Sequence, residues 1–170
     1  VLIDQATVAR RLPDTLVVNI YERQPVACLR SRPRRHLDDE GCILPPRQEA
    51  HMLPLPEITG VKGTRNLRVG SRITDPLVLT SLRFLHLTAT RPDGRFYDVE
   101  TIQLDYSAPA LVVFLRPRGT FRTGARVLLP TQGIPEAMDR LEVIINERTR
   151  ERQPTSFINA TYEINIPVKP

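Results

Sequence analysis

The end of the chain carries the pattern that most constrains its fold. From Ile158 to Val168, apolar and polar residues alternate without interruption. Successive side chains of a strand point to opposite faces, so this pattern predicts a long strand with one solvated face. Pro167 has no backbone N–H to donate to a neighbouring strand, which favours a place at the edge of a sheet. The rest of the chain must therefore supply the sheet that this strand joins.

Two other segments have the periodicity of helices. In residues 75–88, an aspartate that can cap a helix precedes a proline that suits its first position, and leucine and valine recur at helical spacing. A second helix is predicted from Pro135, with charged residues on one face. The apolar residues on its opposite face are Met138, Leu141, Ile144 and Ile145. Both apolar stripes are typical of helices that pack on a core.

The remaining short apolar or alternating runs predict strands. These runs occupy residues 7–11, 16–21, 26–29, 42–44, 102–106, 111–115 and 126–129. The run 111–115 is apolar throughout, which indicates a central strand, whereas the Pro- and Gly-rich residues 45–70 predict an irregular connection. The order of elements favours the α+β class. We expect a mostly antiparallel twisted sheet with two helices packed on one face and a long C-terminal edge strand.

Charge and motifs exclude several classes of function. The net charge of +5 comes mainly from arginine, but the densest run, Arg30–Arg35, has no interleaved aromatic residues that could stack on bases. This run predicts a solvated loop rather than a nucleic-acid site. The three histidines are scattered, and the common nucleotide, zinc and nucleophile signatures are missing. We therefore expect no enzymatic activity, no cofactor and no metal site.

The two cysteines leave two interpretations open. Cys28 and Cys42 flank the basic run in two predicted strands that we take to be neighbours. In an oxidising compartment, a disulfide between them would close a loop of ~15 residues and contribute roughly 3 kcal/mol. The alternative is that both are small buried apolar residues.

Residues 10–60 resemble the bacterial cell-division family FtsQ/DivIB. The resemblance lies in three stretches: Pro13–Ala27 reads PxTLxVxIxERxPVA, Leu37–Leu44 reads LDDEGCIL, and Leu55–Gly60 reads LPEITG. Beyond Gly60, the order of helices and strands agrees with the family, and the resemblance is architectural. It implies that residues 1–23 are the C-terminal remnant of a POTRA domain and that residues 24–170 form the family's β domain.

This resemblance also implies a function. Members are non-enzymatic scaffolds of the division machinery, the divisome, and are held in the inner (cytoplasmic) membrane by one transmembrane helix. Here that helix would lie upstream of Val1, with this region in the periplasm or otherwise outside the cytoplasmic membrane. The family's last strand and the helix beside it receive the single-span partner proteins FtsB and FtsL by β-strand addition. No nucleic acid is implied as a partner.

Carried over by position, the resemblance assigns partner-binding residues on the last strand: Ala160, Thr161, Tyr162, Glu163, Ile164, Asn165, Ile166 and Val168. On the second helix, Arg140 and Arg148 either meet an acidic partner or belong to a solvated helix face, and the sequence leaves both interpretations open. The alternation places Tyr162 on the apolar face, so its ring either contacts the partner or packs in the core. An alternative function is that of another envelope adaptor with a POTRA-type module, in secretion or outer-membrane assembly. Such an adaptor should show repeated POTRA units or a barrel of alternating strands, and neither is visible.

Overall fold

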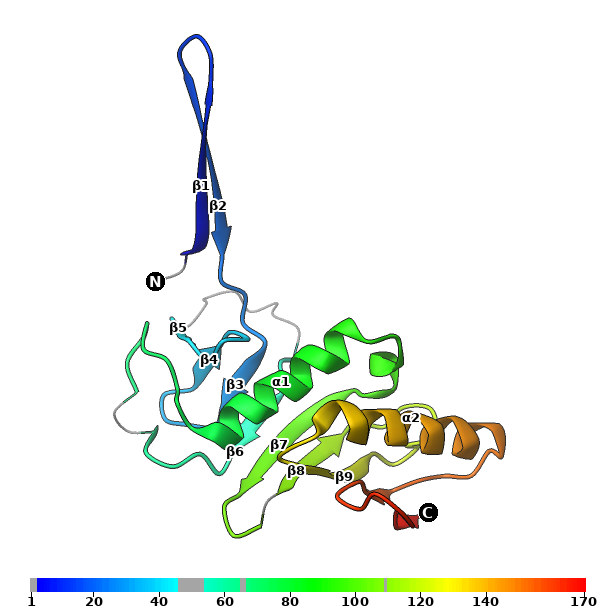
Figure 1. Ribbon diagram of the computed structural model, residues 1–170. Coiled ribbons are helices and arrows are strands. Elements are labelled where there is room, and N and C mark those ends of the chain that lie inside the picture. The colour runs from blue at the N-terminus through cyan, green and yellow to red at the C-terminus, as the bar shows by residue number, and fades with distance from the viewer. Residues whose placement is uncertain (1–2, 46–53, 65–66, 109) are drawn as a thin grey trace.

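The computed structural model describes residues 3–45, 54–64, 67–108 and 110–170. Within these residues, two α-helices, α1 (Pro76–Thr90) and α2 (Ile134–Arg150), lie on the same face of a large sheet (Figure 1). A short 3₁₀ helix, η2 (Pro92–Phe96), follows α1. A separate hairpin projects away from this body (Figure 1).

Nine strands form the large sheet in the part of the chain that the structure describes, in the order β11-β10-β9-β8-β7-β6-β3-β4-β5. Their bounds are β3 (Ala27–Leu29), β4 (Arg35–Leu37), β5 (Ile43–Leu44), β6 (Glu57–Thr59), β7 (Val99–Asp105), β8 (Ala110–Leu115), β9 (Ala125–Pro130), β10 (Phe157–Asn159) and β11 (Val168–Lys169). Three neighbouring pairs are parallel, namely β3–β6, β6–β7 and β9–β10, and the others are antiparallel. The α+β class with a mostly antiparallel sheet is confirmed.

The two helices explain the parallel pairs that flank the centre of the sheet. A parallel neighbour requires a crossover connection, and α1 crosses from β6 to β7 while α2 crosses from β9 to β10. Both helices then pack their apolar stripes on the inner side chains of the sheet. The core includes Leu82 and Phe84 of α1, Met138 and Leu141 of α2, and Ile102 of β7.

Local sequence predicts both helices correctly. The Asp75 carboxylate accepts hydrogen bonds from the N–H groups of Leu77 and Val78, at 2.9 and 3.3 Å, and Pro76 is the first helical residue. In α2, the predicted residues Met138, Leu141 and Ile145 are buried, and Ile144 is half-buried at the rim of the core. The N-terminal cap of a helix and its apolar stripe both depend on residues only a few positions apart in the sequence.

Two short strands, β4 and β6, do not appear among the predicted runs. β4 lies at the end of the basic run that we predicted as a loop, and β6 lies in the predicted irregular connection. Both pair with β3, one on each side, so β3 organises this half of the sheet. A run of three residues is too short for its periodicity to predict a strand. Whether it forms one depends on pairing with strands that are distant in the sequence. Residues 46–53 and 65–66 of the connection lie outside the described residues.

The predicted long C-terminal strand is wrong. β10 ends at Asn159, the chain leaves the sheet, and it returns as the two-residue strand β11, antiparallel to β10. β11, not β10, therefore forms this edge of the sheet. The apolar residues of the predicted strand also do not share one environment. Ile158 and Ala160 are fully buried, whereas Tyr162 and Ile164 are exposed.

Side-chain bonds and turn residues end the strand despite its alternating sequence. The Asn159 side-chain oxygen accepts hydrogen bonds from the Thr161 backbone N–H at 3.2 Å and from the Thr161 hydroxyl at 2.6 Å. Such a bond two residues ahead turns the chain and competes with strand pairing. Asn165 then adopts a left-handed conformation with φ of 53°, which a continuous strand does not contain. Together these residues fold 160–167 into a loop.

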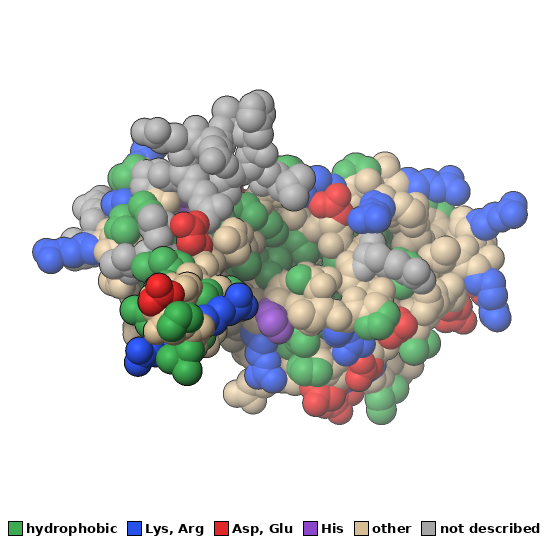
Figure 2. All heavy atoms as spheres, turned by 90° about the horizontal axis from the view of Figure 1, so that it is seen from above, with side chains coloured by type: hydrophobic (Ala, Val, Ile, Leu, Met, Phe, Trp, Pro, Cys, Tyr) green, Lys and Arg blue, Asp and Glu red, His purple; other side chains and the backbone are tan. Residues whose placement is uncertain are grey.

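The hairpin consists of β1 (Ile3–Arg11) and β2 (Thr15–Glu22). Its register places five apolar residues on one face: Ala6, Val8, Leu16, Val18 and Ile20. These side chains are exposed, and hydrophobic atoms are visible on the projecting hairpin in the view from above (Figure 2). At its base, Arg23 forms ion pairs with Asp4 of β1 and with Asp38 of the body. The hairpin thus joins the body through a charged junction.

Of the two interpretations of Cys28 and Cys42, the structure contradicts the disulfide. Cys28 lies in β3, Cys42 directly precedes β5, and β4 lies between these two strands. Neighbouring strands are ~4.8 Å apart, so two spacings exceed the ~7 Å limit between the Cα atoms of a bridged pair. Both thiols are free and buried, and burial raises the pKa of the Cys28 thiol. The two cysteines are small buried residues, as the alternative interpretation predicts.

Candidate partner-binding site

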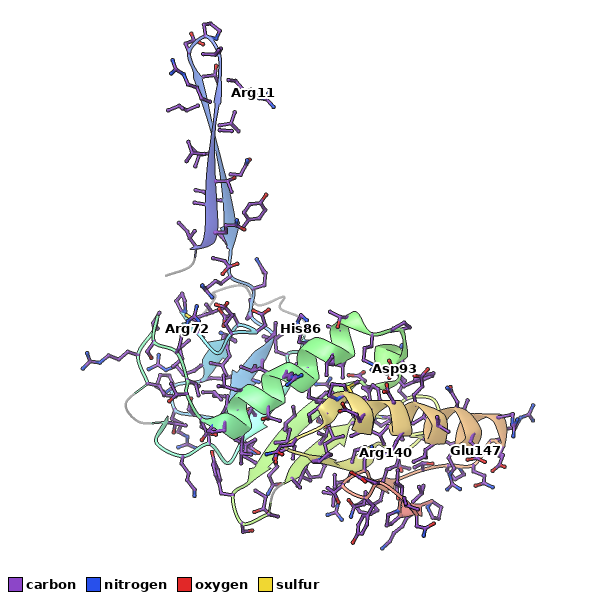
Figure 3. All side chains as sticks on the ribbon, viewed as in Figure 1. Arg11, Arg72, His86, Asp93, Arg140 and Glu147 are labelled. Carbon is purple, nitrogen blue, oxygen red and sulfur yellow. The ribbon has the colours of Figure 1, made fainter. Side chains whose placement is uncertain are left out.

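A groove of about 580 Å³ separates α2 from the C-terminal loop. α2 contributes one side, and residues 163–168 contribute the other. Figure 3 labels Arg140 and Glu147 on this helix, and both line the groove. From the loop side, Glu163, Asn165 and Ile166 complete it. Residues that are about 20 positions apart in the sequence therefore share one surface, because the chain turns back after α2 and again after β10.

The two segments that form this groove carry exposed apolar side chains. Val143 on α2 has 67% of its surface exposed, and in the loop the values are 53% for Tyr162 and 78% for Ile164. Solvated apolar side chains that gather beside a groove mark a surface for association. The open question about Tyr162 is thereby answered, because its ring is not part of the core.

Arg148 holds the connection between α2 and β10 in place. Its guanidinium donates to the Thr155 hydroxyl at 3.2 Å, to the backbone carbonyl of Pro154 at 3.3 Å and to the side-chain oxygen of Gln153. A guanidinium that has three acceptors in its own chain positions the start of β10 and so shapes the groove. We expect Arg148 to support the site more than to reach a partner.

Arg140 is in a different environment. Its Nε atom is buried, and among the described residues it has no hydrogen-bond acceptor. An arginine carries five N–H donors, and leaving a buried one unsatisfied costs free energy. Other atoms of the Arg140 side chain line the groove.

The structure brings most of the predicted partner-binding residues to this site. Arg140, Arg148, Glu163, Asn165, Ile166 and Val168 line the groove, and Tyr162 and Ile164 are exposed in the loop beside it. Ala160 is fully buried and belongs to the core, so it cannot contact a partner in the folded chain. Thr161 is exposed, but its hydroxyl is bonded to Asn159.

Four groove residues were not among the predicted partner-binding residues: Val143, Ile144 and Glu147 of α2, and Glu151, which directly follows the helix. Val143 had a signal in the sequence, since it is an apolar residue outside the buried stripe. The two glutamates had none, because acidic residues on the charged face of a helix are ordinary. With Arg140 and Arg148, they give the groove charges of both signs.

The outer edge of β11 lies beside this groove. The carbonyls of Pro167 and Lys169 accept hydrogen bonds from Asn159 and Ser156, both at 3.0 Å. Backbone groups of alternate residues point to opposite sides of a strand. The N–H and C=O of Val168 therefore point away from β10, to the edge that no further strand of the described residues occupies. Such an edge can pair with a strand from another chain.

Fold and site together define a class of protein: an α+β domain with an open sheet edge beside a groove lined by both charged and apolar side chains. The site has the parts of an interaction surface, namely backbone groups for pairing and exposed apolar side chains. In the described part of the chain, no three metal-binding side chains gather closely enough to hold one ion. None of the helices in that part has the length and hydropathy of a membrane span.

Comparison with known proteins identifies the family that the chain resembles. No family model matches the sequence. Among curated proteins, the chain is 29% identical over 169 residues to "Cell division protein FtsQ" of Geotalea daltonii. This alignment covers 98% of the chain and 58% of that relative, so the chain spans little more than half of the relative's length. The chain is FtsQ/DivIB-like, and the resemblance seen in the sequence is confirmed.

Proposed function

We propose that this chain serves in bacterial cell division as the extracytoplasmic part of an FtsQ/DivIB-type scaffold. In this proposal it recruits FtsB- and FtsL-like bitopic proteins by β-strand addition at β11. The observation that carries the proposal is the open edge of β11 beside a groove with exposed apolar side chains. The similarity to a cell division protein along nearly the whole chain supports it independently.

Binding would use two kinds of contact. The outward N–H and C=O of Val168 would pair with the backbone of an added strand, which supplies affinity with little dependence on sequence. Side chains of the partner would fill the groove and cover Val143, Tyr162 and Ile164, which supplies selectivity. This role requires no catalytic group.

We further propose that residues 1–23 and 24–170 belong to two domains. The hairpin β1–β2 carries an exposed apolar face, and a two-stranded hairpin alone is only marginally stable in water. The face would be buried by the remainder of a POTRA domain. A single transmembrane helix farther upstream would hold the protein in the inner membrane, with this region outside the cytoplasmic membrane.

Hydrogen exchange tests strand addition directly. The chain is mixed with the extracytoplasmic segment of an FtsB-like protein, and exchange of individual backbone amides is followed by NMR. We expect the Val168 amide to become at least about tenfold slower, because it gains a partner. The Asn159 amide is the matched control, since it is already bonded to Pro167. Binding that protects residues of α2 but leaves the Val168 amide unchanged would contradict strand addition.

Point variants are better tools here than a C-terminal truncation. Removing the residues after Phe157 would delete Ile158 and Ala160, both of which are fully buried. Such a chain would lose part of its core and its edge strand together, so lost binding would have two causes. Substitutions at the exposed residues Val143 and Ile164 leave the core intact.

A further inference from the structure

The helix-free face of β8–β11 carries apolar side chains with no covering layer in the described structure. We call this surface the open face, and define it by Val112 and Phe114 of β8, Arg126 and Leu128 of β9, Phe157 of β10 and Lys169 of β11. The strand register places Phe114, Arg126, Phe157 and Lys169 in one row across the sheet. Val112 and Leu128 form the next row. Both helices lie on the opposite face (Figure 1).

The burial pattern separates these residues from the core. Along β8, buried residues alternate with half-buried ones, and Leu111, Val113 and Leu115 face the helices. Val112 and Phe114 point the other way and are not among the residues that pack against the core cluster. A strand with one solvated face normally carries polar residues on that face, whereas β8 is apolar on both. Its composition is that of a strand covered on both sides.

The charges on this surface have one sign. The residues of β8, β9, β10 and β11 include no aspartate or glutamate, but they include Arg126 and Lys169. Both cations lie over the Phe157 ring, at 4.9 and 5.8 Å from its centroid. These contacts hold the cations next to the apolar side chains. Within the described part of the chain, neither cation forms an ion pair.

From this juxtaposition we propose that the open face docks an acidic segment of a protein partner, separately from the groove beside β11. Apolar side chains of the segment would cover Phe114 and Leu128, and its carboxylates would pair with Arg126 and Lys169. A membrane surface fits less well, because the apolar side chains are half-buried between strands and do not protrude. Side chains of a protein segment can reach between the cations, and complementary charge would select an acidic one.

Photo-crosslinking in the source bacterium tests this docking. A benzophenone amino acid replaces Leu128 in the full-length protein, and the cross-linked peptides are identified by mass spectrometry. We expect a protein segment with net negative charge. Reversing both cations, as Arg126→Glu with Lys169→Glu, should lower the yield about tenfold by like-charge repulsion. Arg83→Glu is the matched control, because Arg83 is exposed on α1, across the sheet from the open face.

Other outcomes would overturn the inference. Adducts with lipid, with glycan or with a second copy of this chain would each assign the open face to another occupant. If no adduct forms, or if charge reversal leaves the yield of the adduct unchanged, the proposal that an acidic segment docks here is contradicted. The variant Ile164→Ser separates this proposal from strand addition, since it should weaken binding at the groove and leave the Leu128 adduct unchanged. If the adduct disappears in Ile164→Ser, the open face is not a separate docking surface.

Discussion

Replacing Ile164 by serine should weaken partner binding without weakening the fold. The Ile164 side chain is 78% exposed, so the folded chain gains little from burying it. Exposed substitutions away from special backbone positions change the free energy of unfolding by about 0.5 kcal/mol or less. A partner that covers the groove would bury this side chain, and complete burial of an isoleucine contributes about 1.5–3 kcal/mol.

The exposed fraction converts this range into an expected loss of affinity. About four-fifths of 1.5–3 kcal/mol is roughly 1.2–2.4 kcal/mol, which corresponds to a Kd about 8 to 50 times higher. Isothermal titration calorimetry with the FtsB-like segment would measure the change. Thermal denaturation of the free variant would show that the fold is intact.

Leu12 offers a control with matched exposure. It is 79% exposed but lies in the turn of the hairpin, far along the chain from the groove. Leu12→Ser should leave the Kd unchanged. If Ile164→Ser binds as tightly as the wild type, or if both variants lose affinity equally, the assignment of the groove as the partner site is refuted.

Three further predictions concern stability. Asp75→Ala removes the cap of α1 and should lower the free energy of unfolding by about 1–2 kcal/mol in urea denaturation; no change would mean that the cap is not needed. Asp38→Ala removes the acceptor of the Cys42 N–H in a buried site and one of the carboxylates that pair with Arg23, so we expect the free energy of unfolding to fall by about 2–3 kcal/mol, and a fall of less than about 1 kcal/mol would mean that the site is solvated. Burial, and then the hydrogen bond to Asp75, raise the pKa of Tyr106 to about 12 from 10.0. The neutral phenol therefore stabilises the fold below pH 10, this contribution fades as the pH rises towards 12, and Tyr106→Phe should reduce that pH dependence in denaturation curves unless the phenol is free in solution.

The motifs of the family resemblance acquire a physical role only in the folded chain. Arg23 lies within the first motif, and its guanidinium donates to Asp38 at 2.5 Å and to Glu40 at 2.9 Å in the second motif. Asp38 is buried and also accepts the N–H of Cys42 at 2.7 Å. The sequence predicts a turn at these acidic residues, but it does not indicate that a distant arginine closes it. A partner separated by more than a dozen residues leaves no local pattern.

The sequence alone determined the elements whose stability comes from nearby residues. The cap at Asp75, the apolar stripe of α2 and the central run of β8 each depend on contacts or periodicity within one segment, and all were predicted. The resemblance also pointed to the second helix and the residues after it, which in the structure line one groove. Helix periodicity and family motifs are properties of the linear sequence, so no tertiary structure was needed.

Tertiary structure decided the shape of the candidate site. Alternation after Ile158 predicts a strand, but only Phe157–Asn159 pair with the neighbouring strand β9, and the chain then turns at Thr161 and at the left-handed Asn165 into a loop. This loop leaves Tyr162 and Ile164 in solvent and creates the groove against α2. A pattern of period two describes which residues are apolar, whereas the neighbours that surround each strand determine which of them are covered.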